Sequence, residues 1–259
     1  MKFRCERDAL VEQLSTASRA VSSRGGALPV LTGIHLKAHK DVLTMTGSDL
    51  EITVRASVSV AVTESGEAVL PSRIVVDIIR SLDSGAIEVE VAEEEAKISG
   101  GRSQFSVRTL PVDDFPSLSD PKGDEVTVST ADLAAGLKQV VRAASGDDAR
   151  PILTGVLMSA EDGGLRLVAT DSYRLAVRDL PEATVLSEGQ KVLVPSRALD
   201  ELARVLGDSE EVTVRLGERE VSFDVTVDDG EVQVTTRLIE GEFPNYRQLI
   251  PSSYPNQLT

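Results

Sequence analysis

The segment Pro-Val-Leu-Thr-Gly at 29–33 returns as Pro-Ile-Leu-Thr-Gly at 151–155, which is 122 residues further along the chain. Two more segments return in the same order: Leu-Pro-Ser-Arg at 70–73 as Val-Pro-Ser-Arg at 194–197, and Thr-Leu-Pro-Val-Asp-Asp-Phe-Pro at 109–116 as Arg-Leu-Ile-Glu-Gly-Glu-Phe-Pro at 237–244. The spacing drifts only from 122 to 128 residues. Unrelated segments that match by chance would not keep both order and spacing. The sequence therefore predicts two copies of one domain.

Each copy has about 120 residues, a common size for a domain that folds on its own. Both copies open with a short strand and a helix entry, at 2–10 and at 125–133, and residues 254–259 could be the same opening strand again. We therefore expect a first domain at 1–121, a second at 122–250, and the start of a truncated third at 251–259. A lone opening strand would leave an unpaired edge without a core, so we expect the natural protein to continue.

Composition restricts the class of protein. Cys5 is the single cysteine, so an intrachain disulfide is excluded, and the charged start at Lys2 does not fit a secretory signal. No stretch approaches the roughly 18 apolar residues of a membrane helix. These features predict a soluble, cytoplasmic protein. The net charge of −15 argues against a nucleic-acid partner unless the basic residues gather on one surface, because lysine and arginine drive phosphate binding.

Alternation of apolar and polar residues, rich in valine and threonine, predicts mainly antiparallel sheet in each copy. The clearest strands are at 51–62, 87–91, 212–216, 221–227 and 232–238. Apolar residues at helical spacing predict helices at about 8–22 and 132–145. A second helix in each copy follows Pro-Ser, at about 73–82 and 197–206, where Ser72 and Ser196 can each cap the N-terminus. Strands with segregated helices indicate the α+β class.

The four helix windows 8–24, 72–83, 132–145 and 196–207 hold eight basic and seven acidic residues, so they carry +1 while the rest of the chain carries −16. Arg73, Asp77 and Arg80 recur in the second copy as Arg197, Glu201 and Arg204. Two interpretations stay open at this point. The faces are either ordinary solvated surfaces with ion pairs one turn apart, or a surface for a polyanion.

Signatures of catalysis and of cofactor binding are absent from the sequence. It has no glycine-rich phosphate loop, no dinucleotide fingerprint and no Cys/His cluster with zinc spacing. His35 and His39 are four residues apart on an expected strand, and without a third ligand they indicate surface histidines rather than a metal site. We expect no catalytic residue, no metal and no cofactor.

Comparing the sequences of the two copies shows which residues only the second copy contains. The turn Gly-Ser-Asp-Leu-Glu-Ile at 47–52 becomes Ala-Thr-Asp-Ser-Tyr-Arg at 169–174, and the Phe-Pro at 243–244 is followed by Asn-Tyr-Arg. The shared Ser/Thr-Asp predicts a turn in which side-chain oxygens bond local amides. The added Tyr-Arg pairs are of the kind enriched at interfaces, although a tyrosine lying on apolar surface is an equally good explanation. The second copy is therefore the better candidate for a partner site.

Together these landmarks resemble one family, the bacterial DNA polymerase III beta subunit or beta sliding clamp. The motifs that carry the resemblance run collinearly along the whole chain: Met-Lys-Phe at 1–3 with Glu-Arg at 6–7, Leu-Pro-Val-Leu at 28–31, Gly-Gly-Arg-Ser-Gln-Phe-Ser at 100–106, Thr-Leu-Pro at 109–111, Phe-Pro at 115–116, Ala-Thr-Asp-Ser-Tyr-Arg-Leu-Ala at 169–176 and Phe-Pro-Asn-Tyr-Arg at 243–247.

The resemblance implies tandem DNA-clamp (processivity-fold) domains, each with antiparallel sheets packed on two helices, in a three-domain chain. Two such chains would pair head to tail as a homodimeric ring around duplex DNA, without sequence preference and with helices lining the hole. The family tethers a DNA-directed DNA polymerase during replication and catalyses nothing itself. The DNA-facing residues implied here are Arg24, Arg73, Arg80, Lys138, Arg142, Arg197 and Arg204.

The resemblance also implies a hydrophobic pocket for short linear motifs of the polymerase III alpha subunit, the clamp loader and repair proteins. Matching positions supply Leu153, Thr170, Ser172, Tyr173, Arg174, Leu175, Pro244 and Leu249. Some members have Gly-His where this chain has Ser172-Tyr173, and Gln248 replaces an arginine, so the rim of the pocket departs from the family pattern.

The segment from Arg102 to Val107, with Gln104 and Phe105, is the implied dimer edge. Without a third domain we expect no closed ring. A duplicated scaffold that binds proteins only is the alternative, and an enzyme with an unrecognised site is a third possibility.

Overall fold

The computed structural model describes residues 1–22, 28–118, 123–181, 183–207, 209–228, 230–250 and Ser253. Its helices are α1 (Arg7–Ser18), α2 (Ser72–Ser81), α3 (Thr130–Val140) and α4 (Ser196–Val205). The strands of the first copy are β1 (Lys2–Glu6), β2 (Gly33–His39), β3 (Val42–Ser48), β4 (Ile52–Ser59), β5 (Ala61–Glu64), β6 (Gly66–Pro71), β7 (Ala86–Ala92), β8 (Glu95–Gly100) and β9 (Ser103–Arg108). Those of the second are β10 (Glu125–Ser129), β11 (Gly155–Glu161), β12 (Gly164–Thr170), β13 (Leu175–Leu180), β14 (Lys191–Pro195), β15 (Glu211–Leu216), β16 (Glu220–Val227) and β17 (Gly230–Arg237). Short 3-10 turns include η1 (Pro29–Thr32), η4 (Pro151–Thr154) and η5 (Tyr246–Leu249).

The strands form three antiparallel sheets, which confirms the predicted α+β class. Contacts divide the chain into one unit of residues 1–130 with 201–237 and another of residues 131–200 with 238–259. This division falls elsewhere than the repeat boundary, because a single sheet runs from the first copy into part of the second. In that sheet β17 pairs directly with β4, with Val234 opposite Val54.

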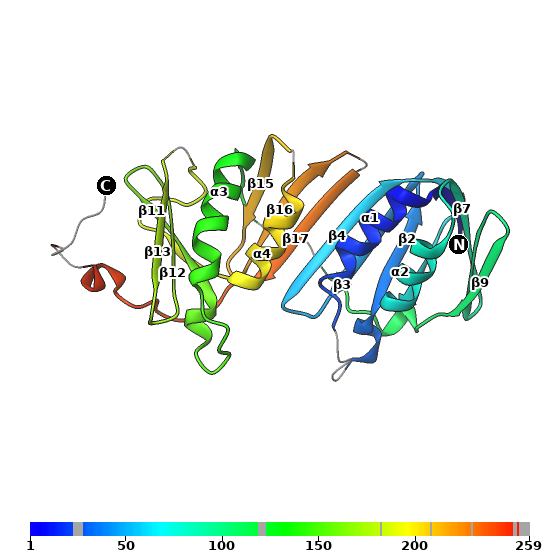
Figure 1. The fold of residues 1–259 in the computed structure, drawn as a ribbon, viewed down its shortest axis with the longest axis horizontal. Coiled ribbons are helices and arrows are strands. Elements are labelled where there is room, and N and C mark those ends of the chain that lie inside the picture. Colours follow the sequence, from blue (N-terminus) through cyan, green and yellow to red (C-terminus); the bar gives the residue numbers. More distant parts are fainter. Residues whose placement is uncertain are drawn as a thin grey trace. The chain divides into compact units, whose positions relative to one another are not determined.

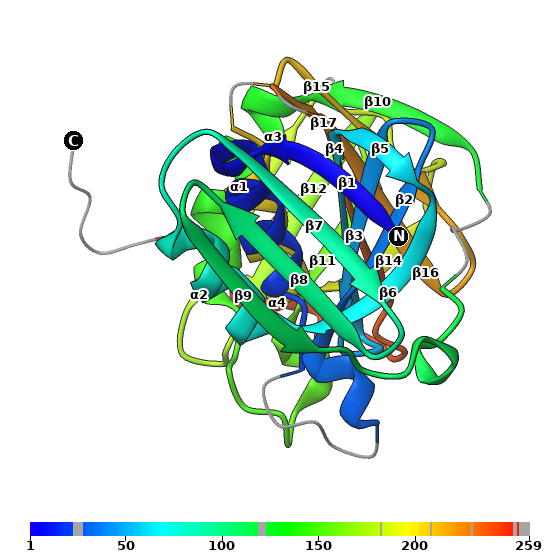
Figure 2. The ribbon, with the colours of Figure 1, turned by 90° about the vertical axis from the view of Figure 1, so that its right-hand side faces the viewer.

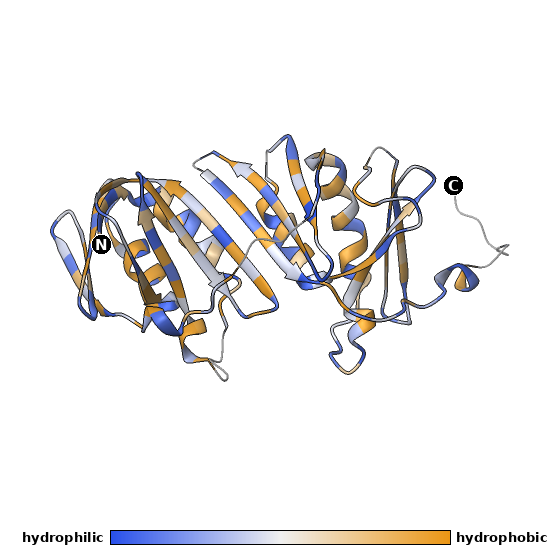
Figure 3. Ribbon diagram, turned by 180° about the vertical axis from the view of Figure 1, so that it is seen from behind, coloured by the Kyte–Doolittle hydropathy of each residue, from blue (hydrophilic) through white to orange (hydrophobic). Residues whose placement is uncertain are grey.

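The first unit holds a five-stranded sheet in the order β5-β1-β7-β8-β9 and an eight-stranded sheet in the order β10-β15-β16-β17-β4-β3-β2-β6. Alternate residues of β4 are buried, and hydrophobic and hydrophilic bands alternate along the strands in Figure 3. Helices α1 and α2 lie side by side (Figure 1), and Figure 2 shows β9 at the outer edge of the five-stranded sheet. Leu10, Leu14 and Ala17 bury the inner face of α1, as helical spacing predicts.

One glycine explains how closely α1 lies on the sheet. A Cβ added to Gly47 of β3 would lie 2.0 Å from the carbonyl oxygen of Ala17, so no larger residue fits there without moving the helix. The equivalent residue of β12 is Ala169, which is fully buried. The two copies therefore seat their first helix differently on the same strand framework.

The second unit holds a four-stranded sheet in the order β13-β12-β11-β14. Helix α3 lies against it at Gly136, where an added Cβ would lie 3.1 Å from Leu167 of β12 and 3.3 Å from Leu180 of β13. The main-chain N–H of Ile239 donates to the carbonyl of Leu193 of β14 (2.8 Å), which fixes the segment after β17 to this sheet.

Three local predictions need correction. The first helix ends at Ser18 rather than near 22, and the third ends at Val140 and continues as a 3-10 turn over Val141–Ala143. Ser72 does not cap α2: strand β6 passes directly into the helix, so Pro71 occupies the cap position and Ser72 lies buried in the first turn. The helix therefore begins without a side-chain cap bond at that position.

Hydrogen bonding also corrects the alignment of the copies by one residue. Leu110 donates its N–H to Val69 (2.8 Å), and Ile239 donates to Leu193 (2.8 Å), so Leu110 corresponds to Ile239 at a spacing of 129 rather than 128. Strand β9 thus corresponds to β17 at a spacing of 129 residues. Strand β4 corresponds to β13 at a spacing of 122 residues, because β4 pairs with β3 in the same register in which β13 pairs with β12.

Among the helices in the described ranges, none is long and apolar enough to cross a membrane.

Candidate functional site

The predicted DNA-facing residues of the first unit lie on exposed helix faces. Arg73 and Arg80 are exposed on α2, where Arg80 Nη2 donates to Ser15 Oγ of α1 (2.9 Å). Arg204 Nη1 lies 3.3 Å from the Glu201 carboxylate, which Arg19 of α1 also approaches to 4.0 Å. Glu201 therefore partly neutralises two cations, and its side chain is only 14% exposed. Arg24 lies outside the described residues.

In the second unit, Lys138 of α3 and Arg142 in the following 3-10 turn are exposed, and so is Arg197 at the start of α4. The neighbouring residues Leu137, Ala143 and Ala198 are buried, so each segment has a buried side and an exposed cationic side. Long cationic side chains on a solvated face are suited to phosphate contacts that carry no sequence preference.

The turn at 170–174 is held by its own polar side chains, as predicted. Asp171 Oδ1 accepts the N–H groups of Tyr173 and Arg174, both at 2.9 Å, and these bonds lower the pKa of Asp171. Thr170 Oγ1 accepts from Ser172 (3.1 Å) and donates to the carbonyl of Arg174 (2.7 Å). Ser172 takes a positive φ of 80°. The result is a fixed turn that leaves Tyr173 95% exposed.

The first copy builds the same turn at 48–52. Asp49 Oδ1 accepts from Glu51 (3.0 Å) and Ile52 (2.8 Å), and Leu50 has a φ of 75°. Glu51 stands where the second copy has Tyr173. The backbone is therefore common to both copies, and the exposed aromatic ring belongs to the second alone.

Only part of the predicted peptide pocket joins one hydrophobic cluster. Leu175 packs against the buried residues Leu157, Val168, Leu193 and Tyr246. The cluster also includes residues that the prediction missed, namely Ile152, Ile239 and Phe243. Phe243 and Tyr246 stood in the quoted Phe-Pro-Asn-Tyr-Arg motif, so the motif contained the signal.

The other predicted pocket residues differ widely in exposure. Leu153 and Thr170 are buried, Leu249 is 61% exposed, and Ser172, Arg174 and Pro244 are exposed. Tyr246, considered above as an interface residue, is only 6% exposed, so its ring belongs to the core.

Charged residues fix the segment that carries Tyr246 to the sheet. Glu161 of β11 accepts hydrogen bonds from Arg166 of β12 and from Arg247, and the Tyr246 hydroxyl donates to it at 3.4 Å. Arg166 also pairs with Asp179 of β13 (Nε–Oδ1 2.5 Å), which lowers the pKa of Asp179. Residues 243–249 are thereby positioned beside the hydrophobic cluster rather than left as a free tail.

The predicted dimer edge corresponds to β9, the last strand of the five-stranded sheet among the residues described. Arg102 and Gln104 are exposed, and Phe105 is 38% exposed. Val107 is buried at 5%, opposite Ala96 of β8, so at this position only the backbone faces the open side of the strand.

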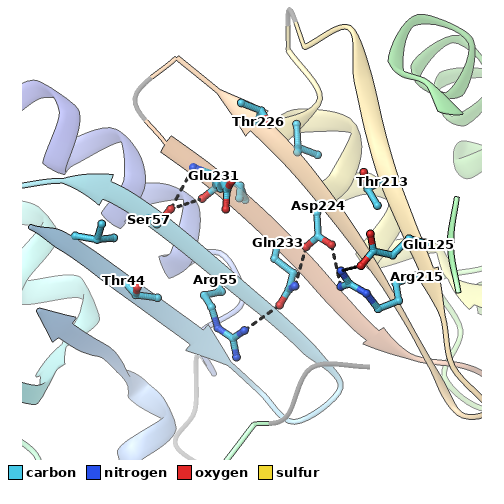
Figure 4. Close-up of a pocket in the computed structure, with 13 residues that line it drawn as sticks. Thr44, Arg55, Ser57, Glu125, Thr213, Arg215, Asp224, Thr226, Glu231 and Gln233 are labelled. Atoms are coloured by element: carbon cyan, nitrogen blue, oxygen red, sulfur yellow. Dashed lines mark hydrogen bonds and ion pairs between the residues drawn. The ribbon is translucent and has the colours of Figure 1, made fainter. Parts of the chain in front are cut away.

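A hollow of about 610 Å³ lies on the polar face of the eight-stranded sheet (Figure 4). Side chains from five strands form a ladder across it. Arg55 of β4 donates to Gln233 of β17 (3.1 Å), Gln233 donates to Asp224 of β16 (2.7 Å), and Arg215 of β15 donates to Asp224 (3.0 Å) and to Glu125 of β10 (2.7 Å). The ladder ties the strands of the two copies together.

The histidines show no metal-binding arrangement. His35 Nε2 lies 2.9 Å from Glu67 Oε2, and its ring stacks on Phe115 with centroids 5.1 Å apart. In the described part of the chain, no group of three or more His, Cys, Asp or Glu residues is placed to hold a metal ion.

Comparisons with known proteins identify the family. Two family models match: the N-terminal domain of the DNA polymerase III beta subunit over residues 1–119 and its central domain over residues 127–245. The beta sliding clamp of Streptomyces coelicolor is 34% identical over 262 residues, which cover 98% of this chain and 68% of that protein. The beta sliding clamp of Staphylococcus epidermidis is also 34% identical, covering 100% of this chain and 70% of that protein.

Comparison with solved structures gives the same family as the sequence matches. A sliding clamp from Pseudomonas aeruginosa, bound to griselimycin, matches with a TM-score of 0.88 and 32% identity, over 98% of this chain and 68% of that one. The sliding clamp from Bacillus subtilis matches with a TM-score of 0.88 and 31% identity, again over 98% and 68%. These matches confirm the clamp fold that the sequence predicted. Because relatives above 30% identity align over nearly its whole length, the chain belongs to the bacterial DNA polymerase III beta subunit family, the beta sliding clamps.

Proposed function

We propose that this chain acts as a sliding clamp, which surrounds duplex DNA and holds DNA polymerase III on its template during replication in the cytoplasm. The observation that carries this proposal is the likeness to a solved clamp, at a TM-score of 0.88 over 98% of the chain. The role is mechanical, since family members are processivity subunits rather than catalysts.

The DNA-facing residues are, in this proposal, Arg24, Arg73, Arg80, Lys138, Arg142, Arg197 and Arg204. Exposed cations on helices inside an otherwise acidic protein, with a net charge of −15, suit a clamp that must slide. Scattered contacts to phosphate attract DNA without reading its sequence. Repulsion from the acidic remainder would discourage DNA from binding elsewhere.

The domain arrangement completes the proposal. Residues 1–121 form the first clamp domain, 122–250 the second, and 251–259 begin a third. A full-length chain would dimerise head to tail through β9, with Arg102, Gln104, Phe105 and Val107 at the edge.

Retention on circular DNA tests the function. We expect a full-length version of the protein, loaded by its clamp loader on nicked circular plasmid, to stay bound in high salt and to be lost when the plasmid is linearised. Replacing Arg73, Arg80, Arg197 and Arg204 by alanine should weaken loading and reduce its salt dependence. Arg219→Ala, at an exposed turn between β15 and β16, is the matched control and should change neither. Equal retention on circles and linear DNA would favour a scaffold that binds proteins only.

A second element of the proposal is peptide docking at Leu153, Thr170, Ser172, Tyr173, Arg174, Leu175, Pro244 and Leu249. The partners are the polymerase III alpha subunit, the clamp loader and other proteins with a clamp-binding motif. Leu175 on its apolar cluster and the 95% exposed Tyr173 supply a surface of the aromatic and aliphatic kind that anchors short peptides.

Calorimetry with a synthetic clamp-binding peptide of the alpha subunit tests this site. Tyr173→Ala should weaken binding by about tenfold, an effect typical of an exposed aromatic anchor. Glu51→Ala alters the equivalent residue of the first copy and should leave binding unchanged. Equal affinity for the native chain and for Tyr173→Ala would show that the ring does not contact the peptide.

A further inference from the structure

Helices α2 and α4 each carry an acidic residue between two arginines, Asp77 in the first and Glu201 in the second. The two acids differ in burial. Asp77 is exposed, whereas the side chain of Glu201 is only 14% exposed. Water and salt screen a buried charge much less than an exposed one. Glu201 is therefore the acid with the stronger effect on the cations near it.

The carboxylate of Glu201 lies near cations from two helices. Its Oε1 is 3.3 Å from Nη1 of Arg204, three residues further along α4. Its Oε2 is 4.0 Å from Nε of Arg19, the residue that follows α1. All three residues belong to the unit of residues 1–130 with 201–237. One carboxylate thus lies between an arginine of the first copy and an arginine of the second.

The contact between Glu201 and Arg19 leaves one carboxylate oxygen without a hydrogen bond. Oε2 of Glu201 is buried from solvent and has no hydrogen-bond partner in the described part of the chain. The 4.0 Å to Nε of Arg19 is too long for a hydrogen bond. Because an unpaired buried carboxylate oxygen is costly, a closer guanidinium would lower the free energy. Glu201 therefore attracts Arg19 and opposes its movement toward another anion.

Arg19 lies on the helix face that an assigned DNA-facing residue also contacts. Its backbone is still helical, so Arg19 is on the same face of the segment as Ser15, four residues earlier. Oγ of Ser15 accepts a hydrogen bond from Nη2 of Arg80 (2.9 Å). The side chain of Arg19 is 35% exposed. Its guanidinium is therefore accessible from solvent on the face where Arg80 lies.

We propose that Arg19 is a further DNA-contacting residue and that Glu201 competes with DNA phosphates for Arg19 and Arg204. The ligand is the phosphate backbone of duplex DNA. Because the carboxylate holds both guanidinium groups, the chain binds DNA more weakly than its arginines alone would allow. Weak contacts to phosphate suit a protein that slides along DNA. The inference rests on the proposed function and adds an internal carboxylate that limits the affinity.

Binding of this chain to a fluorescent DNA duplex, measured by anisotropy between about 50 and 200 mM salt, tests the role of Glu201. Glu201→Gln keeps the size of the side chain and removes its charge. It should tighten binding by about three- to fivefold, the scale of a partly exposed ion pair. It should also steepen the salt dependence by about one to two phosphate contacts. Glu218→Gln makes the same charge change in the exposed turn between β15 and β16 and should leave both quantities unchanged.

A double-mutant cycle separates this specific contact from a general change of charge. Arg19→Gln should weaken DNA binding by less than about twofold in the native chain, because Glu201 already holds Arg19. In the Glu201→Gln background the same change should weaken binding by about threefold or more. Melting temperatures check that each variant is folded. Weaker or unchanged binding in Glu201→Gln, or an equal effect of Arg19→Gln in both backgrounds, would overturn the inference.

Arg80→Ala distinguishes failure of the inference from failure of the proposed function. It should weaken DNA binding whether or not Glu201→Gln is present. If Arg80→Ala weakens binding and Glu201→Gln has no effect, the inference alone is wrong. If neither variant changes binding, the assignment of these helices to DNA is wrong as well.

Discussion

Strands β4 and β13 occupy equivalent places in the two copies, yet among the residues that the structure describes β4 lies between two strands and β13 beside one. Both follow the same side-chain-bonded turn, at Asp49 and at Asp171. Val54 in β4 is 1% exposed, whereas the equivalent residue of β13, Ala176, is only half-buried. Local side chains therefore set where the strand begins, and the neighbouring strand sets how much of it is buried. The same contrast holds for β17, which is paired on both sides, and β9.

The largest expected loss of stability comes from adding a methyl group where β17 pairs with β4. Gly230→Ala should destabilise the chain by about 3 kcal/mol, the upper range for overpacking, because its Cβ would collide with the Ser57 carbonyl. Gly101→Ala at the open edge has no atom nearer than 3.5 Å and should cost about 1 kcal/mol, mainly for its φ of 56°. Urea unfolding measures both. Equal losses would mean that β17 does not approach β4 as closely as described.

A smaller effect is expected from the polar ladder that accompanies the paired strands. Asp224→Ala removes the acceptor for both Gln233 and Arg215 and should cost about 1–2 kcal/mol, since these bonds lie at a partly solvated surface. Thr226→Ala, on exposed β16 surface outside the ladder, is the control and should cost no more than about 0.5 kcal/mol. If the two variants unfold at the same urea concentration, the ladder does not stabilise the sheet.

The smallest effect concerns the open strand and depends on pH. Arg166 lowers the pKa of Asp179 in the folded chain. The pair therefore adds stability above the ordinary aspartate pKa of about 3.9, and this is lost as the pH falls through the lowered value. Arg166→Gln should return the pKa of Asp179 toward about 3.9 in an NMR titration. The pKa of Asp171, lowered by backbone amides, should stay where it is. If the pKa of Asp179 stays the same in Arg166→Gln, Arg166 is not what lowers it.

Much of the fold could be predicted because the copies confirm one another. The repeated Pro-Ser pairs located α2 and α4, and the repeated Ser/Thr-Asp pairs located the two turns. The cap assigned to Ser72 was wrong, since a strand that enters a helix without a loop leaves the proline at the cap. The one-residue shift between Leu110 and Ile239 was missed because the similar letters around them favour the neighbouring alignment.

The sites were less predictable, for a physical reason. The ladder joins residues as far apart in sequence as Arg55 and Gln233, and no local pattern indicates that β17 pairs with β4. The exposure of the tyrosines was equally unpredictable from the sequence. Tyr173 and Tyr246 both precede an arginine, but Tyr173 is 95% exposed and Tyr246 is 6% exposed. The difference arises from the turn at Asp171 and from the cluster around Leu157, which only the folded chain brings together.

Amide hydrogen exchange of β4 and β13 tests the central comparison most directly. In dilute solution the outward-facing amides of β13 should exchange at least about tenfold faster than those of β4, whose bonds to β3 and β17 open only with the sheet. Exchange of the β13 amides as slow as that of the β4 amides would contradict the account.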